Sequence, residues 1–222
     1  MQKQVKGIWL PSTEEHLVPH IQRGPEFAGS GTYQLHKLQA AFPYIKNFRH
    51  AVDIGAHVGL WSRVLARCFA RLTAFEPIEQ HRACFGENVR SGDGCEVELH
   101  PFALSASEET LRFSFRPDNS GDTHVVKNVD DGLGAQVFAR TLDSFDLPPI
   151  DFLKIDCEGY EYFILKGGEA TVRRDRPCII VEQKPGKGRM YGLDDQEAVK
   201  LLQTWGATLK FQIAGDFCLV WQ

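Results

Sequence analysis

The sequence predicts an α/β fold whose mostly parallel sheet ends in an antiparallel hairpin. From about residue 51, short apolar segments of strand length alternate with segments that repeat apolar residues at helical spacing. This alternation is typical of parallel sheets with crossover helices. The last two strands are separated only by the turn Gly215-Asp216, and strands joined by so short a turn are antiparallel neighbours.

Length and composition describe an ordinary globular chain. It has 222 residues, of which 43% are hydrophobic and 24% charged, and these values exclude a disordered or fibrous protein. No apolar run approaches the roughly 20 residues of a membrane span, and no apolar leader stands at the start. The net charge of −4 gives no reason to expect nucleic acid as a partner. We therefore expect a cytoplasmic protein without a membrane or nucleic-acid partner.

The six cysteines show no spacing that indicates a zinc site, and none forms a C-x-x-C pair. Several lie inside apolar runs such as PCIIV and DFCLV. An even number would also allow three disulfides in a secreted protein. Without a visible leader, we expect reduced, mostly buried thiols instead.

The first 50 residues precede the regular alternation. Residues 1–31 are rich in glycine, proline, histidine and charge, and we expect an irregular or loosely helical segment that ends at a glycine-rich turn. Residues 32–47 are expected to be helical, since Leu35, Leu38 and Ala41 recur at intervals of three residues. Pro43 weakens the last turn of that helix.

The elements of the alternating part follow from periodicity and turn residues. Strands are expected at residues 51–55, 72–75, 97–104, 152–155, 178–182, 208–213 and 217–221, and helices at 60–69, 79–90, 160–166 and 194–205. Asp194 and Glu197, three residues apart at the start of the last helix, resemble a capping box.

A β-hairpin or meander interrupts the alternation at residues 110–140. Residues 111–115 alternate with period two, and residues 117–122 are rich in turn formers. Further strands are expected at 125–129 and 136–140, separated by Asp131-Gly132. We expect the turn at 117–122 to contribute to a substrate site.

The best local signal for chemistry is Val52-Asp53-Ile54-Gly55-Ala56-His57-Val58-Gly59, at the first turn from strand to helix. Open α/β sheets bind ligands at such turns, and Gly55 and Gly59 would let the backbone approach a ligand closely. The G-x-x-x-G spacing differs from the dinucleotide fingerprint, and the Asp53 carboxylate would repel a pyrophosphate. It suits a ligand with a positive end. The alternative is an ordinary tight turn.

Glu76 ends the second strand, before Pro77. A carboxylate about 20 residues after the glycine turn can accept both hydroxyls of a ribose. The alternative is an exposed glutamate before a proline turn. A ligand with a ribose, no phosphate and a cationic end points to S-adenosylmethionine.

A second cluster follows the fourth strand, in Lys154-Ile155-Asp156-Cys157-Glu158. Residues two apart in a strand share a face, so Lys154 and Asp156 are expected to point the same way. They form either a structural ion pair or a charged pair aimed at the site. Asp156, Glu158 and Glu182 all stand at carboxyl ends of strands, where open α/β sheets place their chemistry.

The motifs VDIGAHVGLWS, AFEP, ARTLDSF, DFLKIDCEGYEYFILKGG and PCIIVEQ, in this order over about residues 51–183, resemble the FkbM family of S-adenosylmethionine-dependent methyltransferases. The resemblance implies a Rossmann-like class I methyltransferase sheet of seven strands, mostly parallel, with the C-terminal antiparallel hairpin. One domain would then span residues 1–222. An N-terminal helical segment (1–50) and the β-insertion (110–140) remain outside the core, and acceptor choice is expected to come from these two segments or from a second subunit.

The resemblance also implies residue roles. Asp53, Gly55 and Gly59 would line the methionine end of the cofactor, Glu76 would hold its ribose, and Phe102 and Ala103 would flank its adenine. Many relatives carry Asn where this chain has His57. The predicted cofactor-binding set is Asp53, Gly55, His57, Gly59, Glu76, Pro77, Phe102, Ala103 and Asp156.

The family mostly methylates hydroxyl oxygens of small molecules and sugars, so such an acceptor is expected here. Asp156 is the first candidate for the base or for orienting the acceptor, followed by Glu158 and Glu182. Lys154 would pair with the charged form of Asp156 and make it a poorer base but a better anchor. Clustered carboxylates could also hold Mg²⁺, but no fixed ligand spacing supports a metal, and none is assigned.

Three other functions compete with this prediction. A nicotinamide-dependent oxidoreductase lacks support because G-x-G-x-x-G is missing. A non-catalytic cofactor-binding or interaction protein with the same fold would not need the carboxylates kept at Asp53, Glu76, Asp156 and Glu158. A nucleic-acid methyltransferase is disfavoured by the net acidity. A homo-oligomer is compatible with the sequence.

Overall fold

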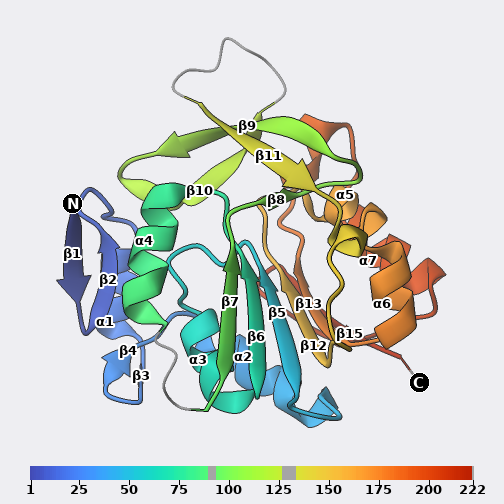
Figure 1. Ribbon diagram of the computed structural model, residues 1–222, viewed down its shortest axis with the longest axis horizontal. Coiled ribbons are helices and arrows are strands. Elements are labelled where there is room, and N and C mark those ends of the chain that lie inside the picture. Colours follow the sequence, from blue (N-terminus) through green and yellow to red (C-terminus); the bar gives the residue numbers. More distant parts are fainter. Residues whose placement is uncertain (90–93, 127–133, 222) are drawn as a thin grey trace.

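A computed structural model describes residues 1–89, 94–126 and 134–221 (Figure 1). A seven-stranded sheet in the order β14-β15-β13-β12-β5-β6-β7 forms its centre, and only β15 runs antiparallel to its neighbours. The strands are β5 (His50–Ile54), β6 (Arg71–Phe75), β7 (Glu96–His100), β12 (Phe152–Ile155), β13 (Cys178–Glu182), β14 (Thr208–Ile213) and β15 (Asp216–Val220). The predicted α/β class, the seven strands and the antiparallel C-terminal hairpin are confirmed.

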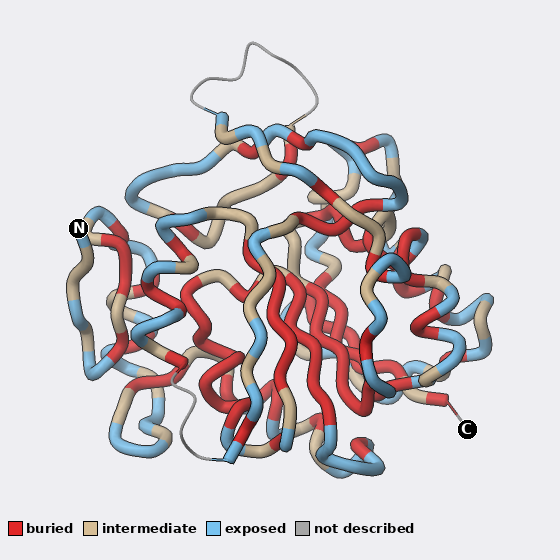
Figure 2. The backbone as a smooth tube through the Cα atoms, viewed as in Figure 1, coloured by how far each residue is buried: buried red, intermediate tan, exposed pale blue. Residues whose placement is uncertain are grey.

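Helices cover both faces of this sheet, which explains why its inner strands are apolar on both sides (Figure 2). In β12, Phe152 packs in a cluster with Leu38 and Leu65, whereas Leu153 packs on the opposite face with Ile164 and Leu202. The helices are α2 (Leu35–Ala41), α3 (Ser62–Cys68) and α4 (Glu79–Asn88) on one side, and α5 (Glu161–Lys166), α6 (Glu169–Asp175) and α7 (Glu197–Thr204) on the other. Within the described ranges, no helix has the length and apolarity needed to cross a membrane.

The N-terminal segment is more regular than its composition predicts. It contains a hairpin of β1 (Gln2–Val5) and β2 (Ile8–Pro11), a helix α1 (Leu17–Arg23), and the two-residue strands β3 (Glu26–Phe27) and β4 (Ser30–Gly31). The hairpin turns at Lys6-Gly7, both with positive φ, and lysine gives no sequence signal for such a turn. The helical expectation holds for α1, for α2 and for a 3-10 turn at Phe42–Tyr44, but not for the hairpin.

The insertion forms a second sheet in the order β10-β9-β11-β8, which lies beyond the carboxyl ends of the central strands (Figure 1). Its strands are β8 (Ala103–Leu104), β9 (Glu109–Arg116), β10 (Asn119–Val126) and β11 (Ala135–Arg140). The strand predicted at 97–104 is therefore split, and Pro101 stands at the break. Most of the predicted turn at 117–122 belongs to β10, which carries a register shift between Asn119 and His124. Asp131-Gly132 and residues 127–129 fall outside the described residues.

The capping box predicted for the last helix is not formed. Helix α7 begins at Glu197, with Gln196 in a left-handed conformation before it and no side-chain cap of its own. Instead, Gln183 after β13 accepts the N–H of Ala198 at 3.0 Å. The helix is thus capped by a residue distant in sequence, which a local motif cannot reveal.

Candidate functional site

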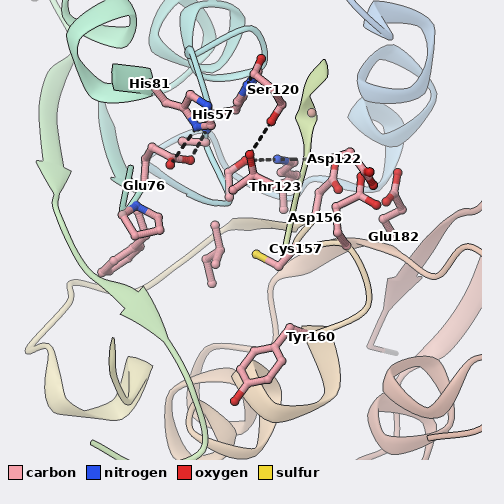
Figure 3. Close-up of a pocket in the computed structure, with 18 of the residues that line it drawn as sticks. His57, Glu76, His81, Ser120, Asp122, Thr123, Asp156, Cys157, Tyr160 and Glu182 are labelled. Carbon is pink, nitrogen blue, oxygen red and sulfur yellow. Dashed lines mark hydrogen bonds and ion pairs between the residues drawn. The ribbon is translucent and has the colours of Figure 1, made fainter. Parts of the chain in front are cut away.

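A cavity of about 330 Å³ lies at the carboxyl ends of the central strands, between the loop after β5, the N-terminal segment and β10 (Figure 3). Ten residues named from the sequence line it: Gly55, His57, Glu76, Pro77, Phe102, Ala103, Lys154, Asp156, Glu158 and Glu182. Asp53 and Gly59 do not line it. The predicted residues therefore converge on one site, with two of them beneath its wall.

Gly55 and Gly59 are required by packing within the protein. Both have positive φ, +74° and +85°. A Cβ at Gly55 would overlap the carbonyl oxygen of Asp156, and one at Gly59 would lie 2.7 Å from Cγ2 of Val89. The structure adds a packing reason to the predicted closeness to a ligand: these glycines allow the loops after β5 and β12 to touch, and let α4 approach.

His57 also adopts the left-handed conformation, with φ +54°. Among residues with a side chain, Asn, Asp and His are enriched in this conformation. The His57 N–H donates to Oε2 of Glu76 at 2.8 Å. The turn after β5 is therefore tied to the end of β6.

Glu76 is buried and fixed by several donors. Its Oε1 accepts the N–H of Ile78 at 2.9 Å and lies 3.2 Å from Nδ1 of His81. Each carboxylate oxygen has further lone pairs, so a carboxylate oriented in this way can still accept ligand hydroxyls. The exposed-glutamate alternative is excluded, because Glu76 is 4% exposed.

Lys154 lies between the buried Asp53 and Asp156, which lines the cavity. Its Nζ lies 3.1 Å from Oδ1 of Asp53 and 3.9 Å from Oδ2 of Asp156, and it donates to the Gly55 carbonyl at 2.8 Å. Asp53 is fully buried and also accepts the Ser62 hydroxyl at 2.6 Å. Burial alone would lower the pKa of Lys154, but the charges of Asp53 and Asp156 raise it above its ordinary value. Lys154 therefore lies closer to the buried Asp53 than to Asp156, the partner predicted for it, and Asp156 lines the cavity.

Three carboxyl groups meet beside Lys154. Oxygen atoms of Asp156, Glu158 and Glu182 lie within 4.8 Å of one another. Lys184 Nζ is 2.9 Å from Oε1 of Glu182 and 3.2 Å from Oε1 of Glu158, so an ammonium already holds the position of a balancing cation. We assign no metal to this cluster. Lys184 was not singled out from sequence, although its spacing of two from Glu182 was an available signal.

The environment separates the protonation of Asp156 and Glu182. Burial opposes the charge of Asp156, yet Lys154, Lys184 and a hydrogen bond from Glu182 lower its pKa. Burial and the neighbouring Asp156 charge raise the pKa of Glu182 to about 10. At neutral pH the pair therefore presents one carboxylate, Asp156, and one neutral acid.

Glu182→Gln is expected to raise the melting temperature at pH 8 and to leave it nearly unchanged at pH 4. At pH 4 Glu182 is protonated in the folded chain and largely so in the unfolded chain. At pH 8 only the unfolded chain ionises, so the wild type loses stability as pH rises from the ordinary glutamate range toward about 10, whereas glutamine does not titrate. Thermal unfolding at both pH values tests this, and an equal shift at both would contradict it.

The insertion and the N-terminal segment complete the walls. Residues 119–123 of β10 line the cavity, so the turn expected to contribute to a substrate site does lie beside it. Lys187 joins the insertion to the cluster, 2.8 Å from both Asp122 and Glu158. Tyr33 and Gln34 close the other side, and no motif in the sequence marks them.

Comparisons with known proteins agree with this architecture. The family described as "Methyltransferase FkbM domain" matches residues 53–207. A crystal structure of the FkbM methyltransferase from Methylobacillus flagellatus is similar at 17% identity and a TM-score of 0.52, over 78% of this chain and 43% of that chain. This chain thus spans less than half of that relative's length.

A second similar crystal structure is the precorrin-6y C5,15-methyltransferase from Geobacter metallireducens, at 13% identity and a TM-score of 0.50, over 91% of this chain and 97% of that one. At such identities the structural likeness shows the fold alone. No curated protein matches. Because the family match spans more than half of its residues, the chain belongs to the FkbM methyltransferase family.

Proposed function

We propose that the protein is an S-adenosylmethionine-dependent methyltransferase that methylates a hydroxyl group of a small molecule or sugar. One observation carries the proposal: Glu76 and Asp156 face the same cavity from different strands, as Figure 3 shows. A fixed carboxylate for a ribose lies on one side, and a charged carboxylate for an acceptor lies on the other. The family membership supports the reaction class.

The chemistry of the cavity walls supports one position for the cofactor. Glu76 would accept the ribose hydroxyls, Phe102 and Ala103 would flank the adenine, and Gly55 and His57 would contact the methionine end. The Asp156 carboxylate, at the far side, suits the positive sulfonium. Asp53 and Gly59 would support this arrangement from beneath, since neither lines the cavity.

Asp156 would orient the acceptor. The bound cofactor supplies an electrophilic methyl group on a sulfonium. Asp156 would accept a hydrogen bond from the acceptor hydroxyl, orient its oxygen and take up the proton that this hydroxyl loses. Its lowered pKa makes it a better anchor than base, so alignment would contribute more, with up to about 7–11 kcal/mol available from positioning.

Acceptor choice would rest with the two segments outside the core, within one domain spanning residues 1–222. The insertion brings Ser120, Asp122 and Thr123 to the cavity, and the N-terminal segment brings Tyr33 and Gln34. These hydroxyl, carboxyl, amide and phenol groups suit an uncharged, hydroxylated acceptor.

Wild type is expected to bind S-adenosylmethionine and S-adenosylhomocysteine, and Glu76→Ala to weaken both about 10–100-fold, because charge-assisted hydrogen bonds to the ribose would be lost. Isothermal titration measures this, with NADH as a comparison ligand. Glu79→Ala, at an exposed position on α4, is the matched control. No heat from either cofactor form at millimolar concentration would contradict the proposed function.

A further inference from the structure

Glu14 joins the N-terminal segment to the insertion. It is fully buried in the turn between β2 and α1, and its Oε1 accepts the N–H of Leu17 at 2.7 Å. Its Oε2 accepts the N–H of Ser120 at 2.6 Å and also the Ser120 hydroxyl. The N–H groups of Glu15 and His16 donate to the Asp118 carbonyl at 2.9 and 3.1 Å. One buried carboxylate therefore anchors the start of β10.

Ser120 extends this contact to the loop after β5. Its Oγ lies 2.8 Å from Nε2 of His57 (Figure 3). The hydroxyl has a single hydrogen. Both oxygens of Glu14 accept backbone N–H groups, and Oε2 also accepts the Ser120 hydroxyl, so the hydroxyl hydrogen points to Glu14. Ser120 must then accept from His57, and Nε2 of His57 carries a hydrogen.

The other ring nitrogen of His57, Nδ1, consequently carries a lone pair and no hydrogen when the ring is neutral. Burial, and then the nearby His81 and Lys154, lower the pKa of His57 well below its ordinary value, so the ring is neutral. His57 lines the cavity, and Nδ1 makes no hydrogen bond to any residue that the structure describes. His57, one of the residues that line the cavity, can therefore accept a hydrogen bond from a ligand through Nδ1.

We propose that Ser120 and Glu14 are positioning residues that fix the tautomer and orientation of His57, so that Nδ1 accepts a hydrogen bond from the bound methyl donor. The inference rests on the proposed function. The donor offers two candidate groups, its α-ammonium and its ribose hydroxyls, which share the chemistry of an N–H or O–H donor. The insertion would then take part in binding the cofactor as well as the acceptor.

Ser120→Ala is expected to raise the Kd of S-adenosylhomocysteine about three- to tenfold, the effect of one lost hydrogen bond. Titration with 5′-methylthioadenosine, which has the ribose but no amino acid, locates the partner. Weakening of S-adenosylhomocysteine alone indicates the ammonium, and weakening of both indicates a ribose hydroxyl. Ser114→Ala on the neighbouring strand β9 is the matched control. An unchanged Kd for S-adenosylhomocysteine overturns the inference.

Nitrogen NMR of ¹⁵N-histidine-labelled wild type gives a second reading that does not depend on Ser120→Ala. The His57 signals, identified by their loss in His57→Asn, should show the hydrogen on Nε2 and a shift of Nδ1 when S-adenosylhomocysteine binds. A hydrogen on Nδ1 in the wild type would overturn the inference. Failure of the wild type to bind would contradict the proposed function itself, whereas binding that ignores Ser120→Ala contradicts this inference alone.

Discussion

Asp156→Asn is expected to lower turnover by about 10²–10⁴-fold and to leave the Kd of S-adenosylhomocysteine within about twofold. Asparagine keeps the size of the side chain but can neither take up a proton nor carry the charge that anchors the acceptor. The Asp156 side chain is 25% exposed and faces the cavity, so the substitution removes no buried packing. The effect should therefore fall on the chemical step.

The assay follows S-adenosylhomocysteine release across a panel of sugars and hydroxylated small molecules, using the first acceptor that the wild type methylates. Glu182→Gln is the matched control. Because Glu182 is a neutral acid at neutral pH, a neutral amide in its place should cost little near pH 7. Undiminished turnover in Asp156→Asn would remove Asp156 from the mechanism. Equal losses in both variants would show that the cluster acts as one unit.

The sequence predicts best what is local. Asp156 and Glu76 could be found because each stands directly after a strand, and parallel strands bring their carboxyl ends to one edge. The packing role of Gly55 could not be predicted, because it depends on a distant residue: a Cβ added at Gly55 would collide with the carbonyl oxygen of Asp156, about 100 residues away in the sequence. A positive φ can be predicted from a glycine, but the neighbour that demands it is a property of the fold.

The contacts between segments lay beyond sequence reasoning for the same reason. Glu14 reads as one of many charged residues in an irregular stretch, yet it is fully buried against Ser120. The turn of the β1–β2 hairpin at Lys6-Gly7 has no typical turn residue in its first position, so the hairpin was missed. The Glu14 carboxylate joins the N-terminal segment to the insertion only in the folded chain, and the periodicity of the sequence does not indicate which distant segments come into contact.

Lys154→Met is expected to destabilise the fold by about 3–5 kcal/mol, since it leaves a buried charge without its partner. Asp53 is fully buried, and among the residues that the structure describes, the Ser62 hydroxyl is the hydrogen-bond donor that would remain beside its carboxylate without Lys154. The Gly55 carbonyl would lose its donor as well. Urea unfolding measures the loss. Arg173→Ala is the control, because its 2.9 Å pair with Glu169 is exposed and should contribute about 0.5 kcal/mol or less.

The double variant Asp53→Asn/Lys154→Met separates pairing from burial. If the cost of Lys154→Met comes from the orphaned charge, removing that charge should restore part of the stability, and the double loss should fall below the sum of the single losses by about 1 kcal/mol or more. Strict additivity would mean that the Asp53 and Lys154 side chains do not stabilise one another. The conserved volume of asparagine would then leave the loop after β5 in place, and Lys154 would act through Asp156 and the Gly55 carbonyl alone.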